Sequence, residues 1–220
     1  MTIMAASSGF NRMLTGDGHR RSRLHDCEGR FVGFSRLLHL PLSIGTALLV
    51  KTAGWRLERP WLGYSAVHRL AGLIRPNWSI LEFGSGLSTV WLARRSADVV
   101  SLEHDRDWHA RVGQILEGRN LRNVDLRFSA EADYARAPID DGRQFDFVLV
   151  DGIARLRSAH IGFAQLKPGG WLYLDNADMP DFRDAAQFLR AQKFAVTERF
   201  TDLTPGQVLT TTGLLVQKAA

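Results

Sequence analysis

The sequence is poor in the residues that carry metal and redox chemistry. It contains a single cysteine, Cys27, so no disulfide can form within the chain. No group of Cys and His residues has the spacing of a zinc site. These absences exclude a disulfide-stapled scaffold and a zinc centre of the common type, so the chemistry has to come from other side chains.

Long apolar runs are also missing. The most apolar stretch, residues 31–55, is interrupted by Pro41 and Gly45 and contains Arg36 and Lys51, so it is too short to span a bilayer. It predicts either a helix that covers an edge of the domain or a segment lying in a membrane interface, where basic flanks favour anionic lipid.

An excess of charge of one sign is missing over most of the chain. The formal net charge is +5, but residues 61–220 hold nineteen Lys and Arg against nineteen Asp and Glu, so the excess lies in residues 1–60. A nucleic-acid-binding domain carries a basic face, and this balance argues against one. The first ten residues lack the basic start and apolar run of a secretory signal. We therefore expect a cytoplasmic protein, with peripheral membrane contact through residues 31–55 as the alternative.

The length of 220 residues suits one well-filled domain. We expect a flexible basic arm over 1–30, an apolar and basic extension over 31–60, and a folded domain over 61–220. Predicted strands lie at 79–83, 98–103, 123–129, 145–150, 170–175, 194–201 and 211–217. Predicted helices lie at 61–74, 88–96, 105–118, 155–165 and 181–191, with a turn at 167–170. This alternation predicts an α/β fold whose mostly parallel sheet is covered on both faces.

A glycine-rich loop follows the first predicted strand. Gly84, Ser85 and Gly86 come after it, and Ser88 and Thr89 then open a helix. In this arrangement a ligand can approach backbone N–H groups at a helix N-terminus. A tight turn without a ligand is the alternative.

Two glutamates narrow the choice of nucleotide. Glu103 ends the second predicted strand about twenty residues beyond the loop, where a carboxylate can accept both ribose hydroxyls. Glu82, at the mouth of the loop, would repel a pyrophosphate but favour the ammonium and sulfonium groups of S-adenosylmethionine. Asp105 is placed to cap the helix that begins at Arg106. The loop therefore fits S-adenosylmethionine better than a dinucleotide.

Three segments carry a family resemblance: 81–86 (Leu-Glu-Phe-Gly-Ser-Gly), 145–152 (Phe-Asp-Phe-Val-Leu-Val-Asp-Gly) and 166–170 (Leu-Lys-Pro-Gly-Gly). They resemble motif I and later motifs of class I S-adenosylmethionine-dependent methyltransferases. The motif sequences are most similar to those of uncharacterised bacterial members with Glu-Phe-Gly-Ser-Gly-x-Ser-Thr. The resemblance implies a Rossmann-like sheet of seven strands, with the last strand antiparallel between two earlier ones. One departure is Ser88, where motif I often has a third glycine.

The resemblance also implies a function and a set of cofactor contacts. It implies methyl transfer from S-adenosylmethionine to a small-molecule or glycan acceptor, at an oxygen atom. The implied cofactor-binding residues are Glu82, Gly84, Ser85, Gly86, Ser88, Thr89, Glu103, His104, Ala130, Glu131 and Asp151. Ala130 stands where the family usually has an Asp beside the adenine, so a backbone contact or Glu131 would substitute.

Polar residues also follow the fourth and fifth predicted strands. Asp151 ends the fourth, at the edge where ligands of open α/β sheets collect, and is the candidate catalytic residue. Together with Asp175 and Asn176 it offers three oxygen ligands that suit Mg²⁺. This set resembles the metal triad of catechol-type O-methyltransferases, although the loop after Asp151 does not. The alternative is a metal-free turn in which Asp175 and Asn176 bond loop amides.

Each of two further residue pairs has two possible roles. Arg155 and Arg157 either bind an acidic substrate or lie solvated at a helix start. Trp61 and Tyr64 either border the cofactor pocket or pack in the core.

Two other functions remain open. One is a noncatalytic adaptor that keeps the fold and attaches to a membrane or a partner through its basic arm. The other is a nucleic-acid methyltransferase, against which the balanced charge of the domain and the absence of an Asn-Pro-Pro-Tyr-like motif both argue.

Overall fold

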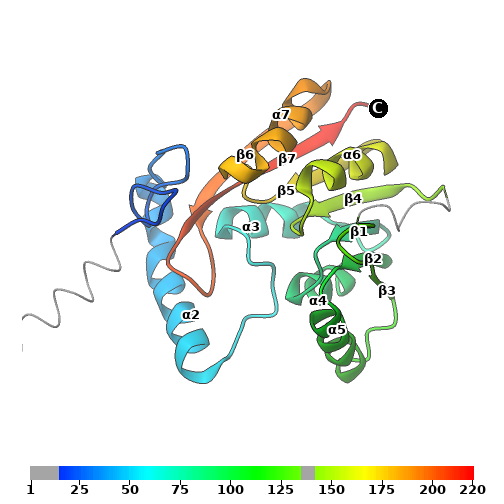
Figure 1. The fold of residues 1–220 in the computed structure, drawn as a ribbon, viewed down its shortest axis with the longest axis horizontal. Helices are drawn as coiled ribbons and strands as arrows, with labels where there is room; N and C mark the ends of the chain where they lie inside the picture. The colour runs from blue at the N-terminus through cyan, green and yellow to red at the C-terminus, as the bar shows by residue number, and fades with distance from the viewer. Residues whose placement is uncertain (1–14, 135–141) are drawn as a thin grey trace, which may run out of the picture.

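The computed structural model describes residues 15–134 and 142–220, which form a seven-stranded sheet in the order β3-β2-β1-β4-β5-β7-β6 (Figure 1). The strands are β1 Ser79–Phe83, β2 Asp98–Glu103, β3 Val124–Phe128, β4 Phe145–Val150, β5 Leu166–Leu174, β6 Phe194–Leu203 and β7 Thr210–Lys218. All pairs are parallel except those of β7, which runs antiparallel between β5 and β6. The predicted fold class, with its inserted antiparallel strand, is confirmed.

Helices cover both faces of the sheet. They are η1 Phe34–His39, α2 Leu40–Ala53, α3 Tyr64–Leu73, α4 Leu87–Ala93, α5 Arg106–Gly118, α6 Arg155–Gln165, η2 Pro180–Phe182 and α7 Arg183–Ala191. On one face α6 and α7 bury Ala159 and Leu189 against the sheet, and on the other α3 and α4 bury Leu70 and Leu92. A parallel sheet covered in this way has to be apolar on both sides, which explains the near-continuous apolar runs of β1 and β4.

One strand begins earlier than predicted. The segment 167–170, expected as a turn, belongs to β5, where the pairing with β4 shifts register between Phe145 and Phe147. Gly169 has φ +75°, a conformation that side chains other than glycine rarely adopt. The apolar pattern of β5 starts only at Trp171, after this irregularity, so the pattern alone placed the strand too late.

The described part of the N-terminal arm is held in place rather than flexible, contrary to expectation. Asp26 is fully buried and accepts hydrogen bonds from Thr212 Oγ1 (3.0 Å) and Arg199 Nη2 (3.1 Å). Arg20 Nε donates to the carbonyl oxygen of Thr210 (2.9 Å). Residues 15–30 are therefore anchored on β6 and β7 by buried polar pairs, while residues 1–14 lie outside the described part.

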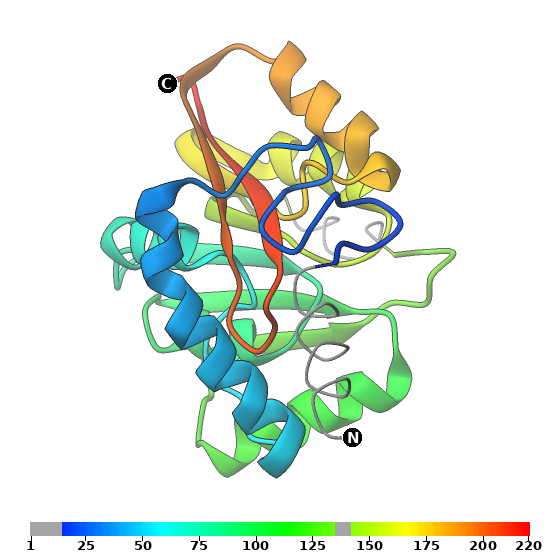
Figure 2. The ribbon, with the colours of Figure 1, turned by 90° about the vertical axis from the view of Figure 1, so that its left-hand side faces the viewer.

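The segment after the arm forms a helix on the β6–β7 hairpin (Figure 2). Ser43 Oγ donates to the carbonyl oxygens of Thr204 (3.0 Å) and Gln207 (2.7 Å), and the Gly206 amide donates to Thr46 Oγ1 (2.9 Å). The helix α2 thus covers this edge of the domain, as one of the two alternatives expected. Among the described residues, no helix has both the length and the apolar character that crossing a membrane requires.

Candidate active site

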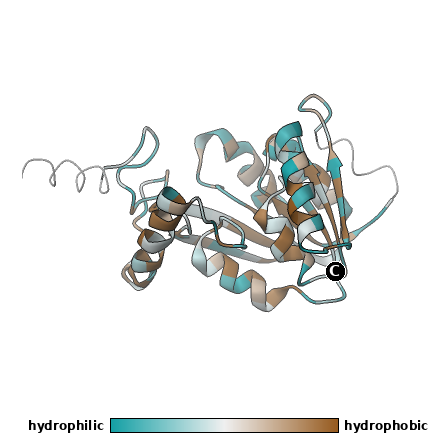
Figure 3. Cartoon of the chain, turned by 90° about the horizontal axis from the view of Figure 1, so that it is seen from below, coloured by the Kyte–Doolittle hydropathy of each residue, from teal (hydrophilic) through white to brown (hydrophobic). Residues whose placement is uncertain are grey.

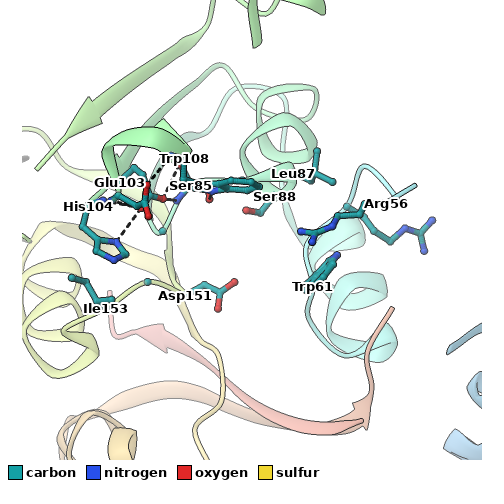
Figure 4. A pocket seen from close by; sticks show the side chains of 15 residues that line it. Arg56, Trp61, Ser85, Leu87, Ser88, Glu103, His104, Trp108, Asp151 and Ile153 are labelled. Carbon is teal, nitrogen blue, oxygen red and sulfur yellow. Dashed lines mark hydrogen bonds and ion pairs between the residues drawn. The ribbon is translucent and has the colours of Figure 1, made fainter. Parts of the chain in front are cut away.

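A cavity of about 560 Å³ opens at the carboxyl ends of β1, β2 and β4 (Figure 4). The glycine loop between β1 and α4, the end of β2 and the loop after β4 form its walls, and the segment before α3 adds Arg56, Arg59 and Trp61. This is the edge at which open α/β sheets bind ligands. Of the predicted residues, those on the wall are Gly84, Ser85, Gly86, Ser88, Glu103, His104, Asp151 and Trp61.

Close backbone packing shapes the floor of the cavity. Gly84 has φ +98°, and a Cβ on it would lie 2.7 Å from the Gly152 nitrogen. A Cβ on Gly152 would lie 2.2 Å from Tyr134 Oη and 3.0 Å from the Gly84 nitrogen. The loops after β1 and β4 can therefore approach each other only because both positions are glycine.

Glu103 is fixed at the end of β2. Its Oε2 accepts from the Ser85 amide (3.2 Å) and Ser85 Oγ (3.0 Å), and its Oε1 accepts from the His104 (2.8 Å) and Asp105 (2.9 Å) amides (Figure 4). Trp108 Nε1 donates to the Ser85 carbonyl oxygen (2.8 Å). The carboxylate is only 3% exposed yet borders the cavity, so it is oriented before any ligand arrives.

Glu82 and Thr89 lie beneath the glycine loop, not at its mouth as expected. Glu82 is fully buried, and its Oε2 accepts from Thr89 Oγ1 (2.5 Å) and Ser101 Oγ (2.6 Å). Thr89 Oγ1 in turn accepts from the Gly86 amide (2.9 Å). Burial raises the pKa of Glu82 to about 7, against the lowering effect of these hydroxyls. The two side chains support the loop from below, and neither is on the cavity wall.

Ala130 and Glu131 are not brought to the cavity. Both are exposed in a turn after β3, in which the Asp133 amide donates to the Ala130 carbonyl oxygen (2.9 Å). The turn directs Tyr134 inward, where it is fully buried. An adenine contact from Ala130 or Glu131 has no support in this arrangement.

Arg155 occupies the place where a metal was expected. It is 7% exposed, and its guanidinium donates to Asp151 Oδ1 (3.1 Å), to Asn176 Oδ1 (3.0 Å) and to the carbonyl oxygen of Asp175. It also stacks over the Phe182 ring at 4.1 Å. Within 15–134 and 142–220, no three His, Cys, Asp or Glu residues are grouped to hold a metal ion. The predicted Mg²⁺ site is therefore not supported, because the Arg155 guanidinium already binds the oxygens that a metal would need.

The same contacts correct the expectation for the arginine pair. Arg155 is neither solvated nor directed at a substrate, because its N–H groups donate hydrogen bonds to the loops after β4 and β5. Arg157 is exposed on α6, as a solvated helix-start residue would be.

Asp151 and Asp175 form a coupled pair beside Arg155. Burial raises the pKa of Asp175 well above its usual range, and the neighbouring Asp151 raises it further. Burial also raises the pKa of Asp151, while Arg155 and a hydrogen bond with Asp175 oppose the rise. We conclude that the pair retains a proton more readily than two isolated carboxyls. The Asp151 side chain is 25% exposed and points into the cavity (Figure 4).

Sequence reasoning missed several residues of the wall, among them Arg56, Arg59 and Trp108. Trp108 lies three residues after Asp105, whose carboxylate caps α5 as predicted by accepting from the Trp108 amide (2.8 Å). Arg56 lies over the Trp61 ring at 4.6 Å on the opposite wall. An aromatic in the first turn of the helix after Glu103 was the available signal for Trp108. Tyr64 packs against His39 (ring centroids 5.1 Å apart), outside this cavity.

This chain is similar to solved structures at low sequence identity. No family model and no curated protein matches the sequence. Among solved structures, an O-methyltransferase from Bacillus cereus in complex with SAH has a TM-score of 0.62 at 19% identity, covering 81% of this chain and 91% of that one. The fold is that of a class I methyltransferase.

Two further structures show how wide this fold group is. The O-methyltransferase TomG from Streptomyces achromogenes, involved in tomaymycin synthesis and in complex with SAM, has a TM-score of 0.60 at 18% identity, covering 98% of this chain and 96% of that one. An rRNA methylase from Streptococcus thermophilus has a TM-score of 0.55 at 15% identity, covering 71% and 96%. At sequence identities this low, the structural similarity establishes only the fold, so the function has to be argued from the site.

Proposed function

We propose that this chain transfers the methyl group of S-adenosylmethionine to an oxygen atom of a small-molecule or glycan acceptor. The observation that carries the proposal is the fixed Glu103 carboxylate on the wall of a cavity whose floor is the Gly84 and Gly152 backbone. O-methyltransferases with this fold in complex with SAH or SAM support the choice of cofactor and of acceptor atom.

The residues present fit this cofactor. A Cβ on Gly84 or on Gly152 would fill the close backbone approach that forms the cavity floor, and the Glu103 carboxylate on the wall is already oriented by the Ser85 amide. Glu103 would accept hydrogen bonds from the ribose hydroxyls, and the loop from Gly84 to Ser88 would hold the amino-acid end. Trp108 and Trp61 would exclude water from opposite walls.

S-adenosylmethionine supplies an activated methyl group, so the protein has to align the acceptor and remove its proton. Asp151 is the carboxylate in the cavity that we propose as the base. Arg155 favours the charged form of Asp151, and we assign the proton of the pair to Asp175, whose pKa is raised further. Asp151 would accept the proton of the acceptor hydroxyl, and the bound cofactor would supply the methyl group, with the sulfur as the leaving group.

Calorimetric titration with S-adenosylhomocysteine tests the proposal. The wild type should bind, and Glu103→Ala should weaken binding about tenfold or more, since hydrogen bonds to a charged group contribute about 1.5–3 kcal/mol. The control is Asp107→Asn, which removes an exposed carboxylate from the first turn of α5 and should leave the affinity unchanged. Asp151→Asn should keep this affinity and lose transfer. A folded wild type that does not bind would refute the function.

We also propose peripheral contact with an anionic membrane through η1 and α2. Figure 3 shows apolar residues along α2, and large side chains remain exposed at Phe34 (84%), Leu38 (79%), Leu42, Leu49 and Trp55. The surplus of basic residues lies in the same part of the chain, within residues 1–60. Apolar side chains flanked by positive charge are the combination that interfacial helices use.

Vesicle sedimentation tests this contact. Vesicles of phosphatidylcholine with phosphatidylglycerol should retain the wild type, and the double variant Leu42→Ser/Leu49→Ser should lose most of that binding. Leu156→Ser removes an equally exposed leucine on α6 and serves as the control. Equal sedimentation of all three proteins would contradict the contact.

A further inference from the structure

A second cavity, of about 730 Å³, lies between η1, α3, α4 and β6. Its walls carry four arginines, Arg36, Arg59, Arg69 and Arg95, and the two histidines His39 and His68. Tyr64, Trp91 and Phe200 supply aromatic surface between them. Arginines gathered around one concavity repel each other unless anions lie among them.

The acidic side chains nearest to this cavity are already engaged elsewhere. Glu198 accepts a forked pair of hydrogen bonds from Arg69 (3.0 and 2.7 Å). Glu58 pairs with Arg94 (2.7 Å) and Arg119. Neither carboxylate neutralises the remaining arginines of the wall.

Asp202, the third acid, is also committed. It is fully buried and accepts from the amides of Ser65 (2.8 Å) and Leu203 (2.8 Å), and it lies 3.0 Å from His39 Nδ1.

Three guanidinium groups are therefore left without a carboxylate among the residues that the structure describes: Arg36, Arg59 and Arg95. Arg95 is held in position, since it lies 4.2 Å over the Trp91 ring and donates to the Trp91 carbonyl oxygen (3.1 Å). Burial, then the charges of Arg59 and Arg94, lower the pKa of Arg95. An anion in the cavity would relieve this repulsion, and a tetrahedral phosphoryl group accepts the paired donors that guanidinium offers.

We propose that this cavity binds a doubly charged phosphoryl group, held by Arg36, Arg59 and Arg95. Arg59 also lines the candidate active site, so the two cavities share a wall. The phosphoryl group therefore belongs to the acceptor or to a lipid beside it, and only this link to the acceptor rests on the proposed function. The aromatic side chains between the arginines suit the apolar part of such a ligand.

Calorimetric titration with inorganic pyrophosphate tests the site directly. The wild type should bind, and Arg59→Gln and Arg95→Gln should each weaken binding about tenfold or more. Arg190→Gln removes an exposed positive charge on α7, on the opposite face of the sheet, and should leave affinity unchanged. Thermal unfolding of each variant confirms that it is folded. No binding by the wild type, or equal binding by all four proteins, would overturn the proposal.

Two further arms separate the possible sources and the two functions. Phosphatidic acid has a phosphomonoester headgroup. If the phosphoryl group belongs to a lipid, vesicles with phosphatidic acid should bind the wild type but not the Arg95→Gln variant. Vesicle binding that is absent, or the same in the variant, together with pyrophosphate binding identifies a soluble ligand. Titration of the wild type with S-adenosylhomocysteine reports on the candidate active site, whose wall carries Glu103, a residue that this cavity lacks. If it fails while pyrophosphate binds, the phosphoryl site stands and the methyltransferase proposal falls.

Discussion

The buried carboxyl of Glu82 should make the stability of this protein fall as the pH rises. Its pKa is raised from 4.5 to about 7, because the carboxyl is fully buried and the charge of Asp151 raises it further, while hydroxyl groups oppose only part of the rise. Between these two values the folded state binds a proton that the unfolded state has lost, so unfolding becomes easier with rising pH. The contribution of protonated Glu82 is fully present below about pH 4.5 and is lost as the pH passes about 7.

The size of the effect follows from the pKa. At about 1.36 kcal/mol per pH unit, the ionised carboxyl costs about 3 kcal/mol above pH 7, and most of this cost develops between about pH 5 and pH 8. In Glu82→Gln one amide oxygen can still accept from Thr89 and Ser101, and the amide nitrogen replaces the unpartnered oxygen. Any cost of that amide is the same at both pH values.

Urea unfolding of the wild type and of Glu82→Gln at the two pH values measures the effect. The free energy of unfolding of the wild type should fall relative to that of the variant by about 2–3 kcal/mol between about pH 5 and pH 8. The other titrating groups are present in both proteins and cancel, except for Asp151, whose charge raises the pKa of Glu82 and therefore belongs to the measured effect. Glu131→Gln, at an exposed position, is the control and should follow the wild type. A difference between wild type and Glu82→Gln that does not change with pH would refute the raised pKa.

Two more predictions concern the loops around the site. Gly152→Ala should lower the free energy of unfolding by about 1–3 kcal/mol, because its Cβ would meet Tyr134 Oη at 2.2 Å, and Tyr134→Phe in the same chain should recover part of the loss. A fully additive double variant in thermal unfolding would contradict that contact. Arg155→Met should cost about 3–5 kcal/mol by leaving Asp151 and its neighbours without a cation, whereas the exposed Arg157→Met should change stability by less than about 0.5 kcal/mol. Equal losses in the two arginine variants would contradict the role of Arg155.

The sequence predicted the sheet well because its central strands β1 and β4 are almost wholly apolar and because clear turn signals separate the strands. The glycine loop and Glu103 could be placed for the same reason, since a strand end fixes where the next residues lie. The start of β5 could not, because the irregular pairing around Gly169 interrupts its pattern.

Buried charges were the main source of error. Asp26 belongs to a segment that is polar in composition, and its partner Thr212 lies 186 residues away. A pattern read along the chain carries no information about such a pairing. The same holds for Glu82, whose position next to the glycine loop suggested contact with a ligand, while strand alternation and the hydroxyls of Thr89 and Ser101 direct it beneath the loop.

The replacement of a predicted metal by Arg155 has a consequence for how an acceptor could be held. Ala154, at φ +48°, begins α6 with a left-handed residue, and the following Arg155 folds back over the ends of β4 and β5. A guanidinium neutralises Asp151 but offers no open coordination position, so it cannot bind two acceptor oxygens as a divalent ion does. Under the proposed function, orientation of the acceptor therefore falls to the opposite wall, where Arg59 joins the two cavities. An acceptor with an anionic group at a fixed distance from its hydroxyl would satisfy both cavities, which makes the phosphoryl site a means of alignment as well as of affinity.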